Sequence, residues 1–423
     1  INGGTMVARV LVEISNINVD KTFDYFVPFE LENKIKVGIR VKVPFATREL
    51  EGFVLEIIND SLDSDYELKQ IIDVIDNEVV LNEELLELGK FMSEKYFSTL
   101  ISSYQTMLPK ALKAQNRTTI NKKFIKIIEI SDEININDHI LNSTQSKIID
   151  LLKNKIQIRK DELNKISASS VKTLLKKGIL KEKEVEEYRL KEIDVIKQEP
   201  FTLTPSQREA KEEILNTKSL PKTFLLHGVT GSGKTIVYIE IVEEMLKQGK
   251  DSIFLVPEIS LTPQMVYSFK SRFGDEVAVL HSRLSEGEKY DEYRKISSGK
   301  VHIVVGARSA VFAPFKNIGV IIIDEEHTTS YKQDNNPKYS AIDIAIERSK
   351  FHNCRVILGS ATPSLESYAK SIKGLYQRIE LKTRFNDKVL PKVEIIDMNK
   401  ERRRGAIFSD KLINEINLSL EKK

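Results

Sequence analysis

The chain has 423 residues, of which 41% are hydrophobic and 30% are charged, and its formal net charge is only +3. This length suffices for two to four compact domains, and the single cysteine, Cys354, excludes a small scaffold held by disulfides. The near balance of charge neither requires nor excludes a nucleic-acid partner, so any strongly basic surface must be local.

The ends and composition of the chain indicate where it resides. No apolar run approaches the roughly 18 residues of a membrane span, and the start lacks the basic-then-apolar pattern of a secretion signal. We therefore expect a cytoplasmic, reducing environment and no membrane contact. Residues 1–5 precede Met6 and resemble the remnant of an expression tag, so the native sequence is expected to begin at Met6.

Residues 6–112 are expected to form a small β-barrel domain. From Met6 to about Asn59, apolar and polar residues alternate between the turn residues Gly38, Pro44 and Gly52, a pattern typical of short strands. A helix is predicted over 82–96, where apolar residues recur at steps of three and four. We expect this helix to pack against the barrel through Leu85, Leu88, Phe91 and Met92.

Residues 113–199 are expected to form a winged-helix domain. Two helical patterns lie at 148–153 and 161–166, and a third, 170–177, ends at Gly178 before an apolar Ile179-Leu180 pair. Three short helices followed by a hairpin are typical of a winged helix.

Residues 200–423 carry the pattern of a parallel α/β sheet. Continuous apolar runs alternate with amphipathic helical stretches, which indicates strands covered on both faces. We therefore predict a multidomain α/β protein whose last domain is a P-loop lobe of the RecA-like kind. The expected strands lie at 223–226, 252–256, 301–305, 320–323 and 355–358.

A phosphate-binding loop follows the first of these strands. The eight residues Gly228, Val229, Thr230, Gly231, Ser232, Gly233, Lys234 and Thr235 fit GxxxxGK[ST] and lead into a helical run. The glycines let backbone amides surround a phosphate, Lys234 places a cation on the outer phosphates, and the Thr235 hydroxyl can ligate Mg²⁺. With a strand before it and a helix after it, the pattern predicts an ATP site.

The strand at 320–323 delivers the acidic run Asp324-Glu325-Glu326-His327 at its carboxyl end. Asp324 is the expected Mg²⁺ carboxylate, and Glu325 is placed to orient or deprotonate an attacking water. In isolation two acids at a strand end are most often solvated surface, but the P-loop upstream favours catalysis. Lys234, Thr235, Asp324 and Glu325 are therefore the candidate catalytic residues.

The strand at 355–358 is followed by Gly359-Ser360-Ala361-Thr362-Pro363. Ser360, Ala361 and Thr362, together with Glu326 and His327, are expected to link the nucleotide to domain movement. A Ser-Ala-Thr turn alone says nothing about function. It becomes informative here because it follows the P-loop and the acidic run in this order.

The order GxxxxGKT, DEEH, SAT resembles superfamily-two helicases, and the surrounding residues resemble the PriA family of primosomal helicases. The resemblance is dense from about Phe201 to Met398 and weaker in the amino-terminal barrel. It rests on 203–207, 255–264 and 306–315 in the lobe, and on 22–25, 37–38 and 43–45 in the barrel.

This resemblance implies roles for residues of the lobe. Gln207 would read the adenine edge, for which a carboxamide offers a paired donor and acceptor; the alternative is an ordinary surface glutamine. The loop containing Tyr331, Lys332, Lys338 and Tyr339 would couple DNA contact to hydrolysis, with tyrosines stacking on bases and lysines meeting phosphates; the alternative is a pair of core-packing tyrosines. In the run 306–310, Arg308 would contact the DNA backbone or else serve a structural purpose.

The resemblance also implies that the barrel holds the 3′ end of a nascent strand. Phe23, Asp24, Tyr25 and Gly38 match the expected pocket, with an aromatic ring to stack on the terminal base and a carboxylate to accept the 3′ hydroxyl. The alternative for Phe23 and Tyr25 is that both belong to the barrel core.

The chain departs from the family after Ser364, where too few residues remain for a second helicase lobe with its arginine fingers. The family's cysteine-rich zinc element is also missing. We therefore expect a truncated chain in which zinc would belong only to the absent part, and in which 409–423 forms a helix leading to the second lobe.

The first hypothesis is an ATP- and Mg²⁺-dependent 3′-to-5′ DNA helicase that recognises stalled forks and initiates primosome assembly. The resemblance implies forked and single-stranded DNA with a 3′ end, single-stranded DNA-binding protein and primosome proteins as partners, with the chain itself a monomer. The alternatives are an RNA helicase or restriction-type translocase with the same motor chemistry, and a fork-binding module without turnover.

Overall fold

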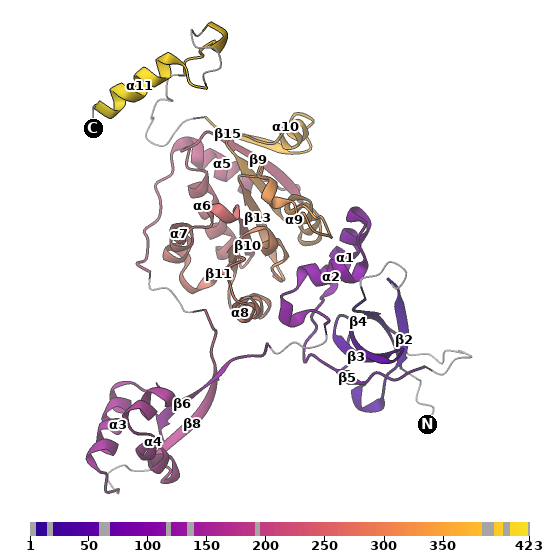
Figure 1. Ribbon diagram of the computed structural model, residues 1–423, viewed down its shortest axis with the longest axis vertical. Helices are drawn as coiled ribbons and strands as arrows, with labels where there is room; N and C mark the ends of the chain where they lie inside the picture. The colour runs from indigo at the N-terminus through magenta and orange to yellow at the C-terminus, as the bar shows by residue number, and fades with distance from the viewer. Residues whose placement is uncertain are drawn as a thin grey trace.

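The computed structural model describes residues 6–14, 20–58, 68–115, 120–132, 139–190, 195–382, 393–400 and 407–421. Figure 1 shows an amino-terminal barrel domain, a small domain at the end of a two-stranded stem, a large α/β lobe and a carboxyl-terminal helix. None of the described helices is long and apolar enough to cross a membrane. The expected tag remnant at 1–5 lies outside the described residues.

The amino-terminal domain is built on a five-stranded antiparallel sheet. Its strands are β1 (Val7–Val12), β2 (Thr22–Phe26), β3 (Arg40–Phe45), β4 (Arg48–Ile58) and β5 (Asp73–Val74), in the order β2-β1-β4-β3-β5. The segment before β5 closes the sheet, because Ile71 N–H donates to Phe26 O at 3.0 Å and Ile72 N–H donates to Lys42 O at 2.9 Å. The predicted strands are confirmed.

Two helices cover one face of this sheet. Helix α1 (Glu83–Tyr96) begins where the Asn82 side chain accepts the Leu85 N–H, and α2 (Leu100–Met107) follows it. Alternate barrel residues such as Leu11 and Phe53 share one core with these helices. The expected helix and its packing against the barrel are therefore confirmed.

The second domain has the predicted helices but not the predicted hairpin. Its elements are β6 (Phe124–Ile130), α3 (Ser143–Asn154), β7 (Ile158–Arg159), α4 (Lys160–Lys176) and β8 (Leu180–Glu186). The non-helical φ and ψ of Ser167 divide α4 into the two short helices expected. However, β8 pairs with β6, which precedes the helices, in the sheet order β7-β6-β8. Of the described residues that follow β8, neither 187–190 nor 195–204 forms a strand.

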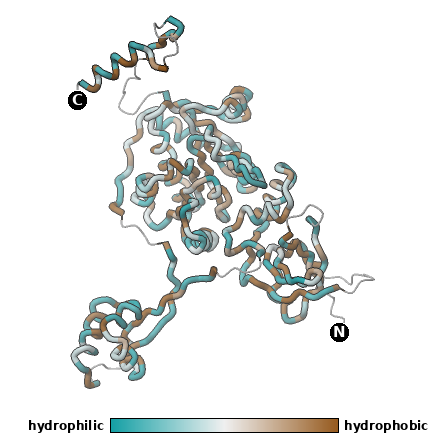
Figure 2. The backbone as a smooth tube through the Cα atoms, viewed as in Figure 1, coloured by the Kyte–Doolittle hydropathy of each residue, from teal (hydrophilic) through white to brown (hydrophobic). Residues whose placement is uncertain are grey.

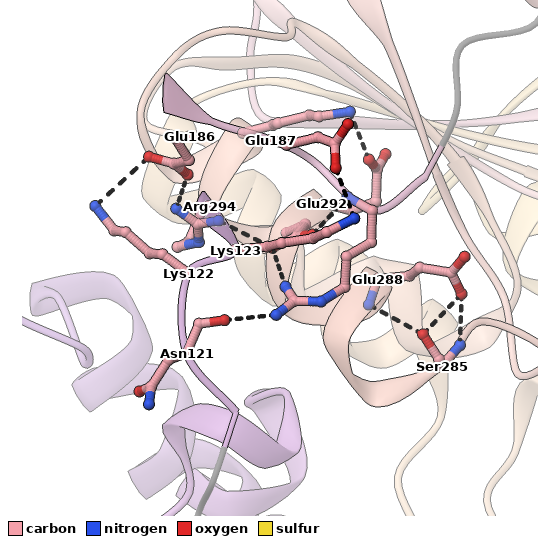
Figure 3. Close-up of polar contacts among 12 residues, drawn as sticks. Asn121, Lys122, Lys123, Glu186, Glu187, Ser285, Glu288, Glu292 and Arg294 are labelled. Carbon is pink, nitrogen blue, oxygen red and sulfur yellow. Dashed lines mark hydrogen bonds and ion pairs between the residues drawn. The ribbon is translucent and has the colours of Figure 1, made fainter. Parts of the chain in front are cut away.

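The stem of this domain is fixed to helix α8 (Glu286–Ser297) of the lobe. The backbone N–H and the guanidinium of Arg189 each donate to the fully buried Asp291 at 2.8 Å. Arg294 pairs with both Glu186 and Asp291, and Lys123 pairs with Glu187 at 2.6 Å. Figure 3 shows the pair of Glu186 with Arg294, which joins β8 to α8, and the pair of Lys123 with Glu187, which joins the two sides of the stem.

The lobe contains a seven-stranded sheet in which every pairing is parallel. Its strands are β9 (Lys222–Gly228), β10 (Asp251–Leu255), β11 (Val277–Leu280), β12 (Ile303–Gly306), β13 (Ile318–Asp324), β14 (Arg355–Ser360) and β15 (Gln377–Leu381), in the order β11-β12-β10-β13-β14-β9-β15. All five predicted strands are confirmed, and β11 and β15 are additional.

Helices cover both faces of this sheet, as the continuous apolar strands predict. One face packs on α5 (Pro205–Leu215), α6 (Lys234–Lys247) and α7 (Pro263–Phe273). The other face packs on α8 and α9 (Ala341–His352), and α1 and α2 of the barrel domain belong to that same core. Figure 2 shows apolar residues concentrated along the central strands. Helices α10 (Leu365–Ile372) and α11 (Asp410–Glu421) complete the described chain, and α11 matches the predicted terminal helix.

A buried ion pair joins the barrel domain to the lobe. Arg348 of α9 donates to both carboxylate oxygens of Glu84 of α1, at 2.6 and 3.0 Å, and the two side chains are 0% and 5% exposed. Arg348 also donates to the carbonyls of Val311 and Ala313 at 2.6 and 2.9 Å. Burial alone would raise the pKa of Glu84, but Arg348 and His352 outweigh it and lower this pKa to about 2.

We predict that Arg348→Met destabilises the chain by about 3 to 5 kcal/mol, because it leaves the Glu84 carboxylate buried without its charged partner. Lys350→Met on the same helix removes an exposed pair with Glu347 and should cost little. Urea denaturation followed by circular dichroism measures both.

The contribution of ionised Glu84 to the free energy of unfolding should be complete above about pH 4.5. It should be lost as the pH falls toward 2, since the pKa of Glu84 is lower in the folded state than in the unfolded state. A variant Arg348→Met as stable as wild type would contradict the role given to this pair.

Candidate nucleotide site and nucleic-acid interface

The P-loop connects β9 to α6 and has the backbone that its glycines predict. Gly231 and Gly233 both have φ of +81°, a conformation that glycine adopts without strain. Lys234 Nζ donates to Gly228 O at 2.9 Å, and Thr235 lies half-buried in the first turn of α6. The Ser232 hydroxyl is buried without a hydrogen-bond partner among the described residues. A phosphate oxygen would satisfy that hydroxyl, so the loop fits a nucleotide.

Gln207 lies against this loop. Its Nε2 donates to Ser232 O at 2.9 Å, and its Oε1 accepts the Thr204 N–H at 3.0 Å. The side chain is 1% exposed, so the alternative of a surface glutamine is wrong. These two bonds hold the P-loop carbonyl in place, and the adenine contact stays a prediction.

Asp324 stands at the carboxyl end of β13, where the sequence predicts it. The hydroxyl of Tyr238, a residue that no sequence pattern singled out, donates to Asp324 Oδ1 at 3.0 Å. Burial and the neighbouring Glu325 raise the pKa of Asp324 to about 6, while the charge of Lys234 acts in the opposite direction. The P-loop follows β9 and Asp324 ends β13, on either side of β14 in the parallel sheet, so Lys234 and Asp324 lie at the same carboxyl edge. A bound Mg²⁺ would favour the ionised carboxylate.

Glu325 occupies a strained backbone position. Its φ is +50°, in the left-handed region that residues other than glycine rarely adopt. Its carboxylate is partly exposed and lies 3.6 Å from His327 Nδ1. Strain of this kind is found where a side chain must point in one particular direction.

The acidic run and the Ser-Ala-Thr turn contact each other directly. The buried carboxylate of Glu326 accepts hydrogen bonds from Ser364 N–H at 2.7 Å and from Ser367 Oγ at 2.9 Å. His327 Nδ1 and Ser360 Oγ are 2.7 Å apart. Ala361 and Thr362 lie in the same turn, and Thr362 N–H donates to Ser360 Oγ at 3.0 Å. The structure thus brings the predicted coupling residues together, and it adds Ser364 and Ser367.

The two tyrosines of the 331–339 loop are packing residues. Tyr331 and Tyr339 are 2% and 1% exposed, so neither ring can stack on a base in this structure. The Tyr331 hydroxyl donates its single proton to Asp324 O at 2.6 Å and also lies 3.2 Å from Leu255 O, and Tyr339 packs against Phe312. The stacking prediction is therefore wrong for these rings, while Lys332 and Lys338 are exposed and remain candidates for phosphate contact.

Arg308 holds this loop through hydrogen bonds to the loop's backbone. Its guanidinium donates to the carbonyls of Ser330 and Lys332 at 3.2 and 2.9 Å and lies over the Tyr339 ring. The structural alternative for Arg308 is therefore confirmed. A contact with the DNA backbone stays a prediction.

The four predicted residues of the 3′-end pocket do not share one face. In the β1–β2 ladder Asp24 lies opposite Arg9 and Phe23 lies opposite Val10, so the side chains of Phe23 and Asp24 point to opposite faces. Tyr25 is 4% exposed in the barrel core, and Phe23 packs edge-on against Phe45. The pocket role is wrong for Tyr25, and Phe23 cannot act beside Asp24.

A cavity of about 610 Å³ lies between the barrel and α1 on the Asp24 face. Arg9, which donates to Asp24 at 3.2 Å, lines it. Val37, the neighbour of Gly38, also lines it. Gly38 has a φ of +85°, and a Cβ there would lie 1.9 Å from the Leu81 carbonyl oxygen. Asp24 and Gly38 are not among the residues that line this cavity, so their place in an end-binding pocket stays a prediction.

Two family models match the chain. The model of the PriA 3'DNA-binding domain (3'BD) matches residues 9–109. The model described as "Type III restriction enzyme, res subunit" matches residues 200–365. These ranges coincide with the barrel domain with its helices and with most of the parallel-sheet lobe.

Relatives match almost the whole chain. "Replication restart protein PriA" of Bacillus subtilis is 41% identical over 98% of this chain and 61% of its own length. The protein of the same name from Chlamydia muridarum is 37% identical over 97% of this chain and 56% of its own length. The chain therefore spans little more than half the length of these relatives. A solved structure of RecG bound to a three-way DNA junction is 27% identical over 46% of this chain and 25% of its own chain, with a TM-score of 0.34.

We predict that Gln207→Ala weakens ATP and GTP binding to the same extent, by about fivefold or more. The variant loses the hydrogen bond that fixes the Ser232 carbonyl, worth about 1 kcal/mol, and this bond does not involve the base. Gln248→Ala, at the exposed far end of α6, is the matched control. Titration of fluorescent ATP and GTP analogues measures the affinities. A loss of affinity confined to ATP would support a contact between Gln207 and adenine.

Proposed function

We propose that this chain, which corresponds to the amino-terminal part of a PriA-family replication restart protein, contains the ATP site and DNA-end site of a 3′-to-5′ DNA helicase. The helicase would recognise stalled or abandoned forks and initiate primosome assembly. The observation that carries the proposal is the pairing, in one chain, of a P-loop facing Asp324 with a barrel domain that matches the PriA 3'DNA-binding domain.

The lobe offers a complete set of groups for binding ATP and activating water. Lys234 would neutralise the outer phosphates, and Thr235 and Asp324 would ligate Mg²⁺, which supplies charge stabilisation to the transferring phosphoryl group. Glu325, held by its left-handed backbone, would orient the attacking water. Glu326 and His327 would carry the nucleotide state to the turn 360–364 through the hydrogen bonds that join them.

The resemblance to the PriA family also supports protein partners, and the two family models help to distinguish the alternative functions. Single-stranded DNA-binding protein and primosome proteins are the protein partners that we propose. The match of 200–365 to the restriction-enzyme model favours a restriction-type translocase as the second candidate. The 3'DNA-binding domain at 9–109 argues against it, since a translocase on duplex DNA has no use for a strand end. A fork-binding module without turnover is the third candidate.

We predict that forked DNA stimulates steady-state ATP hydrolysis more than single-stranded RNA or blunt duplex does. Lys234→Ala should abolish nucleotide binding and all stimulation, because Lys234 is the P-loop's cation for the outer phosphates. Equal stimulation by RNA would favour a different translocase. Bound fork without any hydrolysis would favour a module without turnover.

The position of Asp24, whose ion-pair partner Arg9 lines the cavity between the barrel and α1, supports recognition of a free 3′ hydroxyl. A carboxylate accepts a hydrogen bond from a hydroxyl but repels a phosphate at short range. Asp24 is partly exposed and its second oxygen is not engaged by Arg9, whose contact is with Oδ1. Asp24 is therefore the residue that would distinguish the two ends.

We predict that Asp24→Ala weakens binding to a fork with a 3′ hydroxyl roughly ten- to a hundredfold, since a hydrogen bond to a charged acceptor is worth on the order of 1.5 to 3 kcal/mol. Binding to a fork with a 3′ phosphate should change little. Glu49→Ala, another carboxylate of the same sheet, is the control. Fluorescence anisotropy at fixed salt measures both forks, and equal wild-type affinity for the two ends would remove the end-binding role.

A further inference from the structure

The side chain of Tyr238 extends from the P-loop helix, across one strand of the sheet, to the acidic run. Tyr238 lies in α6, one helical turn after Lys234, and α6 follows the P-loop at the end of β9. Asp324 ends β13, and β14 separates β9 from β13 in the sheet. The Tyr238 hydroxyl nevertheless donates to Asp324 Oδ1 at 3.0 Å. One hydrogen bond therefore joins the helix that carries the phosphate-binding lysine to the expected Mg²⁺ carboxylate.

Gly359 of β14 leaves the space that the Tyr238 hydroxyl occupies. Gly359 lies opposite Asp324 in the β13–β14 ladder and opposite Leu226 in the β14–β9 ladder. A Cβ on Gly359 would lie 1.6 Å from the Tyr238 hydroxyl oxygen and 2.8 Å from Cζ of the ring. Since Gly359 is not among the glycines with positive φ, this position requires glycine for space and not for backbone conformation. The position of the Tyr238 hydroxyl thus explains the glycine before the Ser-Ala-Thr turn.

The ring of Tyr238 holds the hydroxyl at one fixed point. The residue is 0% exposed. Its ring centroid lies 5.6 Å from that of Phe254, which stacks on Phe269. A side chain packed in this way keeps one rotamer, so its hydrogen bond to Asp324 forms without further loss of conformational entropy. The core of the lobe consequently sets the position of the hydroxyl.

This hydrogen bond restricts the Asp324 carboxylate, whose terminal torsion is otherwise broad. Oδ1 is engaged by Tyr238, while no side chain of the described residues donates to Oδ2. The main-chain carbonyl of Asp324 is held separately by the Tyr331 hydroxyl at 2.6 Å. The residue is thus fixed at its backbone and at one carboxylate oxygen, and the other oxygen is left for a ligand.

A neutral donor suits a carboxylate that must bind a cation. A lysine or arginine in the place of Tyr238 would form an ion pair with Asp324 and compete with Mg²⁺. A hydroxyl orients the carboxylate and leaves its negative charge uncompensated. Mg²⁺ takes hard oxygen ligands in near-ideal octahedral geometry. The hydroxyl of Thr235 and the carboxylate of Asp324 fit this requirement, so a wrongly oriented carboxylate should weaken the binding of Mg²⁺.

We propose that Tyr238 is a positioning residue that orients Asp324 for the Mg²⁺ bound with ATP, and that Gly359 is glycine because it must admit the Tyr238 hydroxyl. The inference rests on the proposed function and deepens it, since it concerns the same nucleotide site. The alternative is that Asp324 only satisfies a buried hydroxyl, as buried polar groups usually require. A packing role affects nucleotide binding equally with and without Mg²⁺, whereas a positioning role affects only the contribution of Mg²⁺.

The test measures the dissociation constant of a fluorescent, non-hydrolysable ATP analogue in EDTA and in saturating Mg²⁺. The constant in EDTA divided by the constant in Mg²⁺ reports the contribution of Mg²⁺ to binding and does not depend on hydrolysis. Tyr238→Phe keeps the ring and removes the hydroxyl. The constant in EDTA should remain that of the wild type. The ratio should fall roughly ten- to a hundredfold, the usual effect of losing a hydrogen bond that orients a metal ligand.

Two controls test whether Tyr238 acts through Asp324. Tyr96→Phe is the matched variant, because the Tyr96 hydroxyl also donates to a carboxylate, that of Asp343, at 3.0 Å, but at the contact between α1 and α9. It should leave both dissociation constants unchanged. Asp324→Asn should itself lower the ratio, and adding Tyr238→Phe to it should lower the ratio no further.

The outcomes separate this inference from the proposed function. A ratio that falls in Tyr238→Phe, but falls no further when that change is added to Asp324→Asn, would support the positioning role. A wild-type ratio in Tyr238→Phe, whether or not the overall affinity falls, would overturn it and leave the helicase proposal intact. A further fall in the Asp324→Asn background would also overturn it, because Tyr238 would then act by another route. Failure of the wild-type chain to bind the nucleotide more tightly in Mg²⁺ than in EDTA would overturn both.

Discussion

The arrangement of this molecule depends on Arg348, a fully buried charge that must be neutralised where it lies. Glu84 of the barrel domain supplies the carboxylate, and the carbonyls of Val311 and Ala313 take the remaining donors. A buried guanidinium held by four hydrogen bonds tolerates little displacement, because movement would leave its charge unpaired in a low dielectric. The barrel domain is consequently a fixed part of the lobe, and α1 and α2 complete one face of the lobe's core.

The buried ion pair between Arg348 and Glu84 determines where the proposed functional surfaces lie. It sets residues 106–115, which follow α2, opposite the carboxyl ends of β10, β11 and β12, and a groove of about 890 Å³ lies between them. It also holds 311–313, directly after Arg308, whose guanidinium fixes the 329–339 loop. Through Tyr331 that loop reaches the carbonyl of Asp324. A short series of packed residues thus connects this groove to the nucleotide site, a physical network of the kind that can transmit a ligand's effect.

Sequence patterns predicted the elements and motifs well, because apolar periodicity and glycine spacing are local properties. The P-loop, the acidic run and the five apolar strands lie where expected. Roles that depend on which face or partner a side chain meets were less predictable. Gln207, Tyr331 and Tyr339 are buried, and Phe23 and Asp24 diverge because β2 alternates. Tyr238 and Glu84 carried no sequence signal, since their partners are distant in the chain.

The central claim is that the DNA-binding surface and the ATP site form one coupled unit within this chain. The most direct measurement is the dissociation constant of a fluorescent ATP analogue with and without a saturating single-stranded oligonucleotide. Our account predicts that the strand tightens nucleotide binding by at least about fivefold, and that the analogue tightens strand binding by the same factor, as linkage requires. An ATP affinity that is identical in the presence and absence of bound DNA would contradict it.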